Sequence, residues 1–255
     1  MRYKNVLGIT ISDTNISLFK NVMIGSLTKN KNVCISATGA HGIVSSRYNK
    51  ELYNTLQSFD YNLPDGQPSV WIAKLKGAKS IQRCFGPFVF SEILEATSQL
   101  KINHYFCGGK EGVANRLVDS CKKLFNNKNV VGTFSPPFRE LSENYIKTMA
   151  NDINIKKTDV LWIGISTPKQ EILAKRLSKY TNVKLIITVG AAFDYYTDSI
   201  KIAPKWIQSA GFEWLFRLIL EPKRLWKRYF EIVPKFLCFG ILDILGLYKH
   251  PFERK

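Results

Sequence analysis

The stretch LWIGISTPKQEILAKRL, residues 161–177, changes from apolar to polar within a few positions. The apolar run at residues 160–165 fits a parallel strand that is covered on both faces. A helix is then expected to begin at Pro168. Thr167 to Gln170 matches the Thr-x-x-Gln capping box, and proline suits the first helical position. Because open α/β sheets hold ligands at the carboxyl ends of their strands, the same corner is also a candidate pocket wall.

Apolar runs and helix-like segments alternate in this way over most of the chain. Strands are predicted at residues 33–37, 61–63, 102–107, 129–132, 159–165 and 184–189. Helices are predicted at residues 41–58 (with a break), 68–76, 87–100, 111–125, 139–152 and 168–179. The first 25 residues predict an edge strand and a short helix. This order is typical of βαβ units, and it predicts an α/β fold with a mostly parallel sheet and helices on both faces.

The alternation ends near residue 200, and the rest of the chain has a different character. Residues 201–255 are helical in pattern, aromatic and basic. We therefore expect an α/β domain at residues 1–200 and a helical appendage at residues 201–255.

The chain of 255 residues carries a formal net charge of +17, with 37 Lys and Arg against 20 Asp and Glu. Such an excess predicts an anionic partner, either nucleic acid, phospholipid or a phosphorylated small molecule. Residues 201–255 hold only 11 of the basic and 5 of the acidic residues, so the excess is spread over the whole chain.

Several kinds of chemistry lack their usual sequence patterns. The three histidines show no ligand spacing, and no Gly-x-Ser-x-Gly or Walker motif occurs. Asp-x-Asp, with which many nucleotide-sugar transferases hold a divalent cation, is also missing. We therefore expect neither a metal nor a cofactor. Five cysteines without a Cys-x-x-Cys pair indicate reduced thiols in the cytoplasm. The first residues lack the apolar run expected of a signal peptide, and no stretch reaches the ~18 uncharged apolar residues expected of a spanning helix.

Glycines mark one candidate phosphate site. YFCGGKEGVANRL, residues 105–117, runs from a predicted strand through Gly108 and Gly109 into a predicted helix. Glycines at such a junction let backbone N–H groups approach a diphosphate. The alternative is a tight turn between strand and helix.

Two carboxylates follow predicted strands. Asp65, in the stretch Leu-Pro-Asp-Gly, is placed to act as a general base, although Pro-Asp-Gly is also favourable turn chemistry. Asp194 comes after the last predicted strand and could accept hydrogen bonds from a ribose or a base edge, or cap a helix.

The appendage carries a row of cations. On an ideal helix Arg224 and Arg228 each fall within roughly 20° of Arg217, although Pro222 would kink or divide that helix. Arginine with tryptophan and tyrosine on an amphipathic helix suits an anionic membrane or a lipid-linked phosphate. The alternative is a helix that packs on its own domain with a solvated basic face.

The order of the motifs is more specific than any one of them. LPDGQPSVW, RCFGPF, CGGKEGVA, VGTFSPPFREL, IGISTPKQE, VGAAFDYYTD and APKWIQSAGFEWLFRLILEPKRLWKRY closely resemble the WecG/TagA/CpsF family of bacterial glycosyltransferases over about residues 33–230. The resemblance implies a Rossmann-like fold and metal-independent, inverting transfer from a UDP-sugar. The sugar would be N-acetylmannosamine, its uronic acid or a related hexose. The acceptor would be a polyprenyl-diphosphate-linked saccharide of teichoic acid, capsule or exopolysaccharide synthesis.

The same resemblance implies a peripheral enzyme on the cytoplasmic face of the membrane, to which the appendage contributes contact. It implies no nucleic-acid partner and leaves the oligomeric state open. A non-catalytic basic module that binds acidic lipid or nucleic acid is the rival hypothesis.

Site residues are carried over by motif. Asp65 matches the general base, Thr38 the threonine of an early Thr-x-Asn motif, and Arg83 a cation that offsets diphosphate charge. Gln170 and Asp194 match donor-site residues.

Three positions depart from the family pattern. Ala40 replaces the asparagine of Thr-x-Asn, and Phe88 stands where relatives commonly carry aspartate. Residues 196–198, Tyr-Thr-Asp, replace the usual Ala-Gly. These departures raise the question of a changed donor or acceptor, or of weakened activity.

Overall fold

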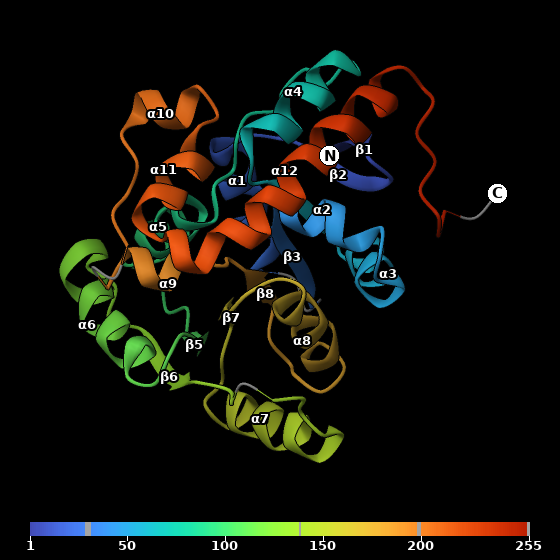
Figure 1. Ribbon diagram of the computed structural model, residues 1–255. Coiled ribbons are helices and arrows are strands. Elements are labelled where there is room, and N and C mark those ends of the chain that lie inside the picture. The colour runs from blue at the N-terminus through green and yellow to red at the C-terminus, as the bar shows by residue number, and fades with distance from the viewer. Residues whose placement is uncertain (29–31, 138, 198–199, 254–255) are drawn as a thin grey trace.

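The computed structural model describes residues 1–28, 32–137, 139–197 and 200–253, and it is built around one parallel sheet (Figure 1). The six strands lie in the order β4-β3-β8-β7-β5-β6, and every neighbouring pair is parallel. Their bounds are β3 Val33–Thr38, β4 Tyr61–Pro64, β5 His104–Gly108, β6 Val130–Phe134, β7 Val160–Gly164 and β8 Leu185–Thr188. All six strands lie where they were predicted, and the α/β fold is confirmed.

Helices cover both faces of this sheet, as the buried character of its strands requires. They are α1 Ile16–Ser26, α2 Ala40–Ser46, α3 Lys50–Ser58, α4 Gln67–Leu75, α5 Gly86–Ala96, α6 Val113–Phe125, α7 Glu143–Ile155, α8 Lys169–Leu177 and α9 Ala192–Tyr195. In β7, Trp162 packs in the core with α1, α5 and α6, whereas Leu161 and Ile163 pack in the core with α7 and α8. The strand therefore contributes alternate side chains to two cores.

The first residues differ from the prediction of an edge strand. β1 (Arg2–Val6) and β2 (Ile9–Asp13) pair with each other as a separate antiparallel hairpin. Leu7 and Gly8, with φ of 49° and 82°, form the two-residue turn between them, and such a turn with positive φ suits the twist of a hairpin. The hairpin does not join the six-stranded sheet, and side chains such as Gln57 and Asn62 donate to its carbonyl groups.

The C-terminal segment consists of α10 (Lys205–Ser209), α11 (Glu213–Leu220) and the long α12 (Pro222–Ile244). Pro222 divides the predicted helix, because α11 ends before it and α12 starts with it. Figure 1 shows α12 crossing the molecule beside α2 and α4. Ile232 and Phe236 of α12 share a core with residues of the hairpin, α2, α3 and α4. The segment is thus packed on residues 1–200. Within the described residues, no helix combines the length and apolar composition needed to cross a bilayer.

Candidate active site

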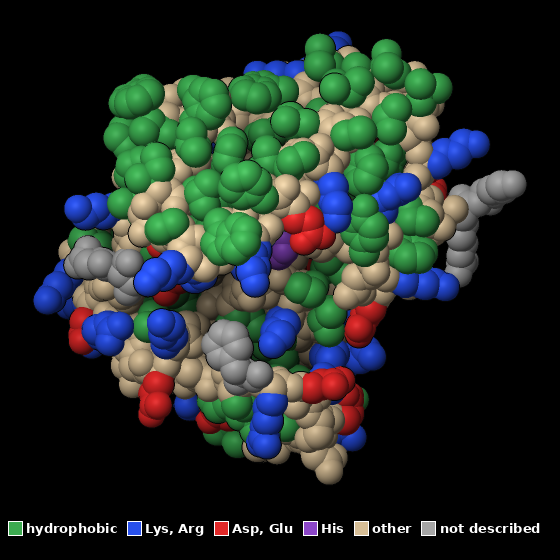
Figure 2. All heavy atoms as spheres, in the orientation of Figure 1, with side chains coloured by type: hydrophobic (Ala, Val, Ile, Leu, Met, Phe, Trp, Pro, Cys, Tyr) green, Lys and Arg blue, Asp and Glu red, His purple; other side chains and the backbone are tan. Residues whose placement is uncertain are grey.

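A cleft of about 1300 Å³ opens at the carboxyl ends of the parallel strands. The loops after β3, β4, β5, β7 and β8 form its floor and walls, and α11 and α12 contribute another wall. Figure 2 shows the surface hollowed here, with Lys and Arg side chains around the opening. The cleft lies where ligands bind in open α/β sheets.

Asp65 lines this cleft directly after β4. Its backbone N–H donates to the Thr38 carbonyl at 3.3 Å, and its Oδ1 accepts the Gly86 N–H at 2.8 Å. Burial raises the pKa of Asp65 to about 6, against opposing contributions from Arg83, the Gly86 N–H and Arg217. A carboxylate with this pKa is ionised at neutral pH and is a stronger base than an ordinary aspartate.

Arg83 lies beside Asp65 on the same wall. Its Nε donates to the Asp65 carbonyl at 2.7 Å, and its guanidinium lies 4.2 Å from the centre of the Phe85 ring. An ion pair of 2.5 Å joins it to Glu213 of α11. The structure therefore brings Asp65 and Arg83 together, with the C-terminal segment holding the arginine.

The predicted arginines of the C-terminal segment all line the cleft. Glu221 forms ion pairs with Arg217, at 3.4 Å, and with Arg224. Arg228 has no ion pair or hydrogen bond with any described residue, and burial together with Arg224 and Arg217 lowers its pKa. Glu221 is the ion-pair partner of two of the three guanidinium groups, and Arg228 remains as a cation that suits an anionic ligand.

Asp194, in α9, faces these cations across the cleft. Burial raises its pKa, whereas Arg224, Arg217 and Lys110 lower it. Lys110 and Gly109, from the loop after β5, also line the cleft. The cleft therefore has a glycine turn and a lysine on one strand end and a carboxylate on another.

Comparison of the chain with known proteins identifies its family. A match to the Glycosyl transferase WecG/TagA/CpsF family covers residues 4–249. The chain belongs to this family. It is therefore a glycosyltransferase of the WecG/TagA type.

Two relatives carry the same printed name, N-acetylglucosaminyldiphosphoundecaprenol N-acetyl-beta-D-mannosaminyltransferase. The one from Bacillus subtilis (strain 168) is 27% identical over 190 residues, which are 73% of this chain and 70% of the relative. The one from Bacillus spizizenii is 24% identical over 241 residues, which are 93% of this chain and 90% of the relative. The similarity thus extends over most of both chains.

The Thr-Pro-Lys-Gln-Glu corner of this glycosyltransferase does not form the predicted capping box. Helix α8 begins at Lys169, after Pro168, and no side chain caps its N-terminus. The Thr167 hydroxyl and the Gln170 amide instead donate to Oε1 of Glu171, at 3.0 and 2.8 Å. Oε1 of this buried carboxylate also accepts the Ser36 hydroxyl at 3.4 Å, and such donors offset the cost of burying the Glu171 side chain.

Gln170 connects this corner to the next strand. Its Oε1 accepts the Gly190 N–H at 3.2 Å, after β8. Thr167, Lys169 and Gln170 line the cleft. The corner is therefore part of the pocket wall, as the second interpretation of the sequence required.

Two other predicted site residues lie outside the cleft lining. The Thr38 hydroxyl is buried and donates to Oγ of Ser36 at 2.9 Å. Gly108, with φ of 141°, packs so closely on β7 that a Cβ would come within 2.4 Å of the Gly164 oxygen. The structure thus places Thr38 beneath the Asp65 loop and gives Gly108 a packing role between strands.

The departures from the family pattern lie in different surroundings. Ala40 lines the cleft. Phe88 packs edge-on against Phe85, and the Tyr196 hydroxyl donates to the Pro87 carbonyl at 2.9 Å. Asp198 lies outside the described residues. Of the described departures, only that at Ala40 changes the cleft wall.

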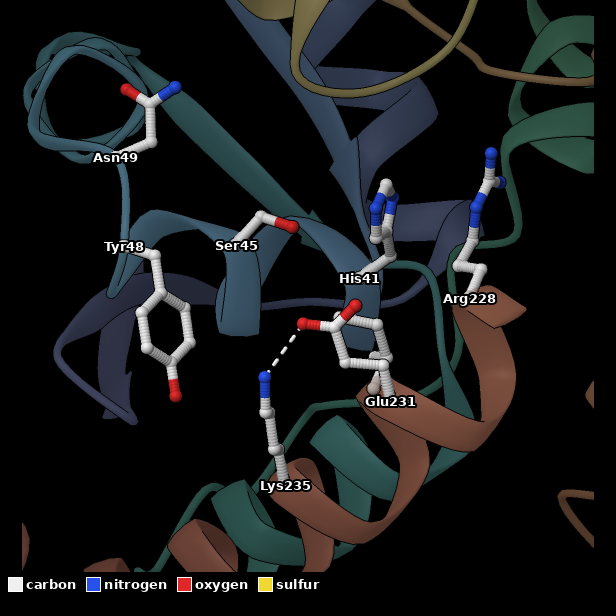
Figure 3. A pocket seen from close by; sticks show the side chains of 8 residues that line it. His41, Ser45, Tyr48, Asn49, Arg228, Glu231 and Lys235 are labelled. Atoms are coloured by element: carbon white, nitrogen blue, oxygen red, sulfur yellow. Dashed lines mark hydrogen bonds and ion pairs between the residues drawn. The ribbon is translucent and has the colours of Figure 1, made fainter. Parts of the chain in front are cut away.

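A smaller cavity of about 340 Å³ adjoins the cleft between α2, the start of α3 and α12 (Figure 3). His41 and Arg228 line both spaces. Burial and the Arg228 charge lower the pKa of His41 to about 4, so its imidazole is neutral at physiological pH. Figure 3 shows the ion pair of Lys235 with Glu231, 2.7 Å long, at the edge of this side cavity.

Sequence reasoning did not single out Glu213, Tyr195 or His41. Glu213 is part of the GFEW motif, which was the available signal, but the partner of its carboxylate depends on how α11 docks. Among the described residues no cluster of three or more His, Cys, Asp or Glu side chains could hold a metal ion.

Proposed function

We propose that this protein transfers a sugar from a UDP-sugar to a polyprenyl-diphosphate-linked saccharide, with inversion and without a metal. The sugar is N-acetylmannosamine, its uronic acid or a related hexose, and the product enters teichoic acid, capsule or exopolysaccharide synthesis. The observation that carries the proposal is the Asp65 carboxylate, which lines a cleft together with a surplus of guanidinium groups. The relatives' printed name supports the choice of donor and acceptor.

Asp65 acts as the general base in this proposal. Its Oδ2 has no hydrogen-bond partner among the residues that the structure describes, so it is free to take the proton of an acceptor hydroxyl. The oxygen of that hydroxyl attacks the anomeric carbon from the face opposite UDP. The bond from that carbon to the β-phosphate oxygen breaks, and UDP leaves with the electron pair.

Cationic groups stabilise the negative charge that develops on the phosphates of the leaving group. On the donor side, Gly109 and Lys110 offer backbone and side-chain donors, and Asp194 and Gln170 complete the donor pocket. Arg217, Arg224 and Arg228 bind the diphosphates of donor and acceptor in this proposal. Guanidinium groups bind phosphate oxygens in pairs, and fixed charges cost little reorganisation as the leaving group forms.

An apolar surface next to the cleft suits the lipid of the acceptor. Figure 2 shows apolar side chains gathered where Figure 1 places α4, α10, α11 and α12. We call this surface the apolar face; the exposed apolar residues on or next to these helices include Trp71, Leu75, Trp206, Phe212, Leu215, Ile219, Trp226, Phe230, Leu237 and Ile241. A large exposed apolar patch beside basic residues favours docking on an anionic membrane. We therefore propose that residues 201–255 attach the catalytic domain peripherally to the inner face of the cell membrane.

The decisive test is transfer by wild-type protein and Asp65→Asn with a panel of UDP-sugars and a synthetic lipid-diphosphate acceptor. Products are read by mass spectrometry. The variant should bind UDP normally, also in EDTA, and transfer about 10²- to 10⁴-fold more slowly, because it lacks the base. Transfer at the wild-type rate would remove Asp65 from this role. A protein that binds no UDP and makes no product would instead be the non-catalytic basic module.

A further inference from the structure

Two carboxylates lie close to one guanidinium at the base of the cleft. Arg83 donates from Nε to the backbone oxygen of Asp65, at 2.7 Å, but pairs through Nη2 with Glu213, at 2.5 Å. The Phe85 ring against its face limits its movement. The arginine is therefore next to Asp65 while its charge is paired with another residue.

The Asp65 carboxylate is held without such an ion pair. Oδ1 accepts the Gly86 N–H at 2.8 Å, and no described cation lies within ion-pairing distance of either oxygen. A Cβ on Gly39 would lie 3.3 Å from Oδ2, so the neighbouring backbone closes that side. Oδ2 has no hydrogen-bond partner among the described residues, and Asp65 lines the cleft from which a donor can reach it.

Glu213 is itself fixed between the body of the protein and the C-terminal segment. Its Oε1 accepts the Tyr195 hydroxyl at 3.1 Å, and its side chain is only 12% exposed. Tyr195 comes from α9 and Arg83 from the loop before α5, whereas Glu213 is the first residue of α11. The contact therefore forms only when α11 is docked.

We propose that Glu213 is a positioning residue that holds Arg83 away from the Asp65 carboxylate and so keeps that carboxylate available as the base. This inference rests on the proposed function. The Arg83 charge already acts on the Asp65 carboxyl, whose pKa it lowers, and Arg83 freed from Glu213 could turn to that carboxylate. A carboxylate engaged by a guanidinium is a weaker base, and its lone pairs are occupied.

The charges around Asp65 agree with this role. Burial raises its pKa, Arg83 and Arg217 lower it, and the Glu213 charge raises it. The titratable and charged groups that face Asp65 or Glu213 are Arg83, Cys84, Tyr195, Arg217 and Tyr229. When the Glu213 charge is lost, the positive charges of Arg83 and Arg217 are no longer opposed by it, so the pKa of Asp65 should fall.

The test is a titration of the Asp65 carboxyl carbon by NMR in ¹³C-aspartate-labelled full-length protein, with Asp65→Asn to assign the signal. In Glu213→Gln the midpoint should fall by about one pH unit or more, and Glu213→Asp should restore part of the difference. Glu92→Gln removes a glutamate from a partly exposed ion pair with Lys20, neither of which lines the cleft, and should leave the midpoint unchanged. An unchanged midpoint in folded Glu213→Gln overturns the inference.

Kinetics supply a second readout. In Glu213→Gln the acid limb of the pH profile of kcat/KM should move to lower pH, and kcat should fall about tenfold with little change in KM for the UDP-sugar. A fall in activity without movement of the limb would show a merely structural role. If Glu213→Gln does not fold, Tyr195→Phe removes the hydrogen bond that holds Glu213 and should shift the midpoint in the same direction. Full turnover by Asp65→Asn would refute the proposed base, while the NMR titration would still decide the role of Glu213.

Discussion

At the scale of single residues, Asp65 shows a conflict between stability and function. Burial raises its folded-state pKa to about 6, from the ordinary value of 3.8. The ionised carboxylate therefore destabilises the folded protein above about pH 6, and this effect disappears below the ordinary value. Asp65→Asn should increase the free energy of unfolding by about 3 kcal/mol at pH 7.5 and by little near pH 3.5. Denaturant unfolding at both pH values measures this.

The control for that experiment is Asp119→Asn on the exposed side of α6, which should change stability little at either pH. A loss of stability in Asp65→Asn at pH 7.5 would contradict the burial argument.

The same scale shows what a sequence can and cannot predict. Asp65 and Arg83 were predictable because a motif and a strand end marked them. The direction of the Thr38 side chain was not, since it depends on which face of β3 packs on α8. The Glu213–Arg83 ion pair joins residues 130 positions apart, and no local pattern encodes such a contact.

At the scale of elements, the buried strands were predictable from their apolar runs. The division between α11 and α12 was predictable from Pro222. The hairpin was not, because the Leu-Gly turn is a weak signal and β1 carries exposed residues. The capping box failed for a different reason. The side chains of Thr167 and Gln170 bind the Glu171 carboxylate, an arrangement that depends on the burial of Glu171 and that the motif does not encode.

The prediction for these elements concerns the apolar face, to which α10, α11 and α12 contribute Trp206, Ile219 and Phe230, all more than 70% exposed. Changing the three to serine should weaken partition onto anionic vesicles at least about tenfold, because each loses apolar area that would enter the interface. Vesicle co-sedimentation measures this. Leu124 and Ile155 are also well exposed but lie on α6 and α7, so their serine variant should partition as the wild type does. Equal partition of all three proteins would contradict the membrane proposal.

At the scale of the whole molecule, the C-terminal segment is tied to the N-terminus as well as to the cleft. Asp243 of α12 accepts the Leu7 N–H at 3.0 Å and pairs with Lys76 at 2.8 Å. The His250 ring stacks on Tyr53 at 4.2 Å. Contacts at both ends of the segment imply that it folds together with residues 1–200.

Asp243→Ala tests this cooperativity. The change leaves a lysine and a buried N–H without their partner, so the free energy of unfolding should fall by about 3 kcal/mol. Glu231→Ala breaks an exposed ion pair on the same helix and should change the free energy of unfolding little, because solvent screens that pair. Calorimetry should show one transition in each protein, lowered chiefly in Asp243→Ala. Two separate transitions, with only the smaller one affected, would instead mean that α12 unfolds independently, and the contact of Glu213 with Arg83 would then be lost before the sheet unfolds.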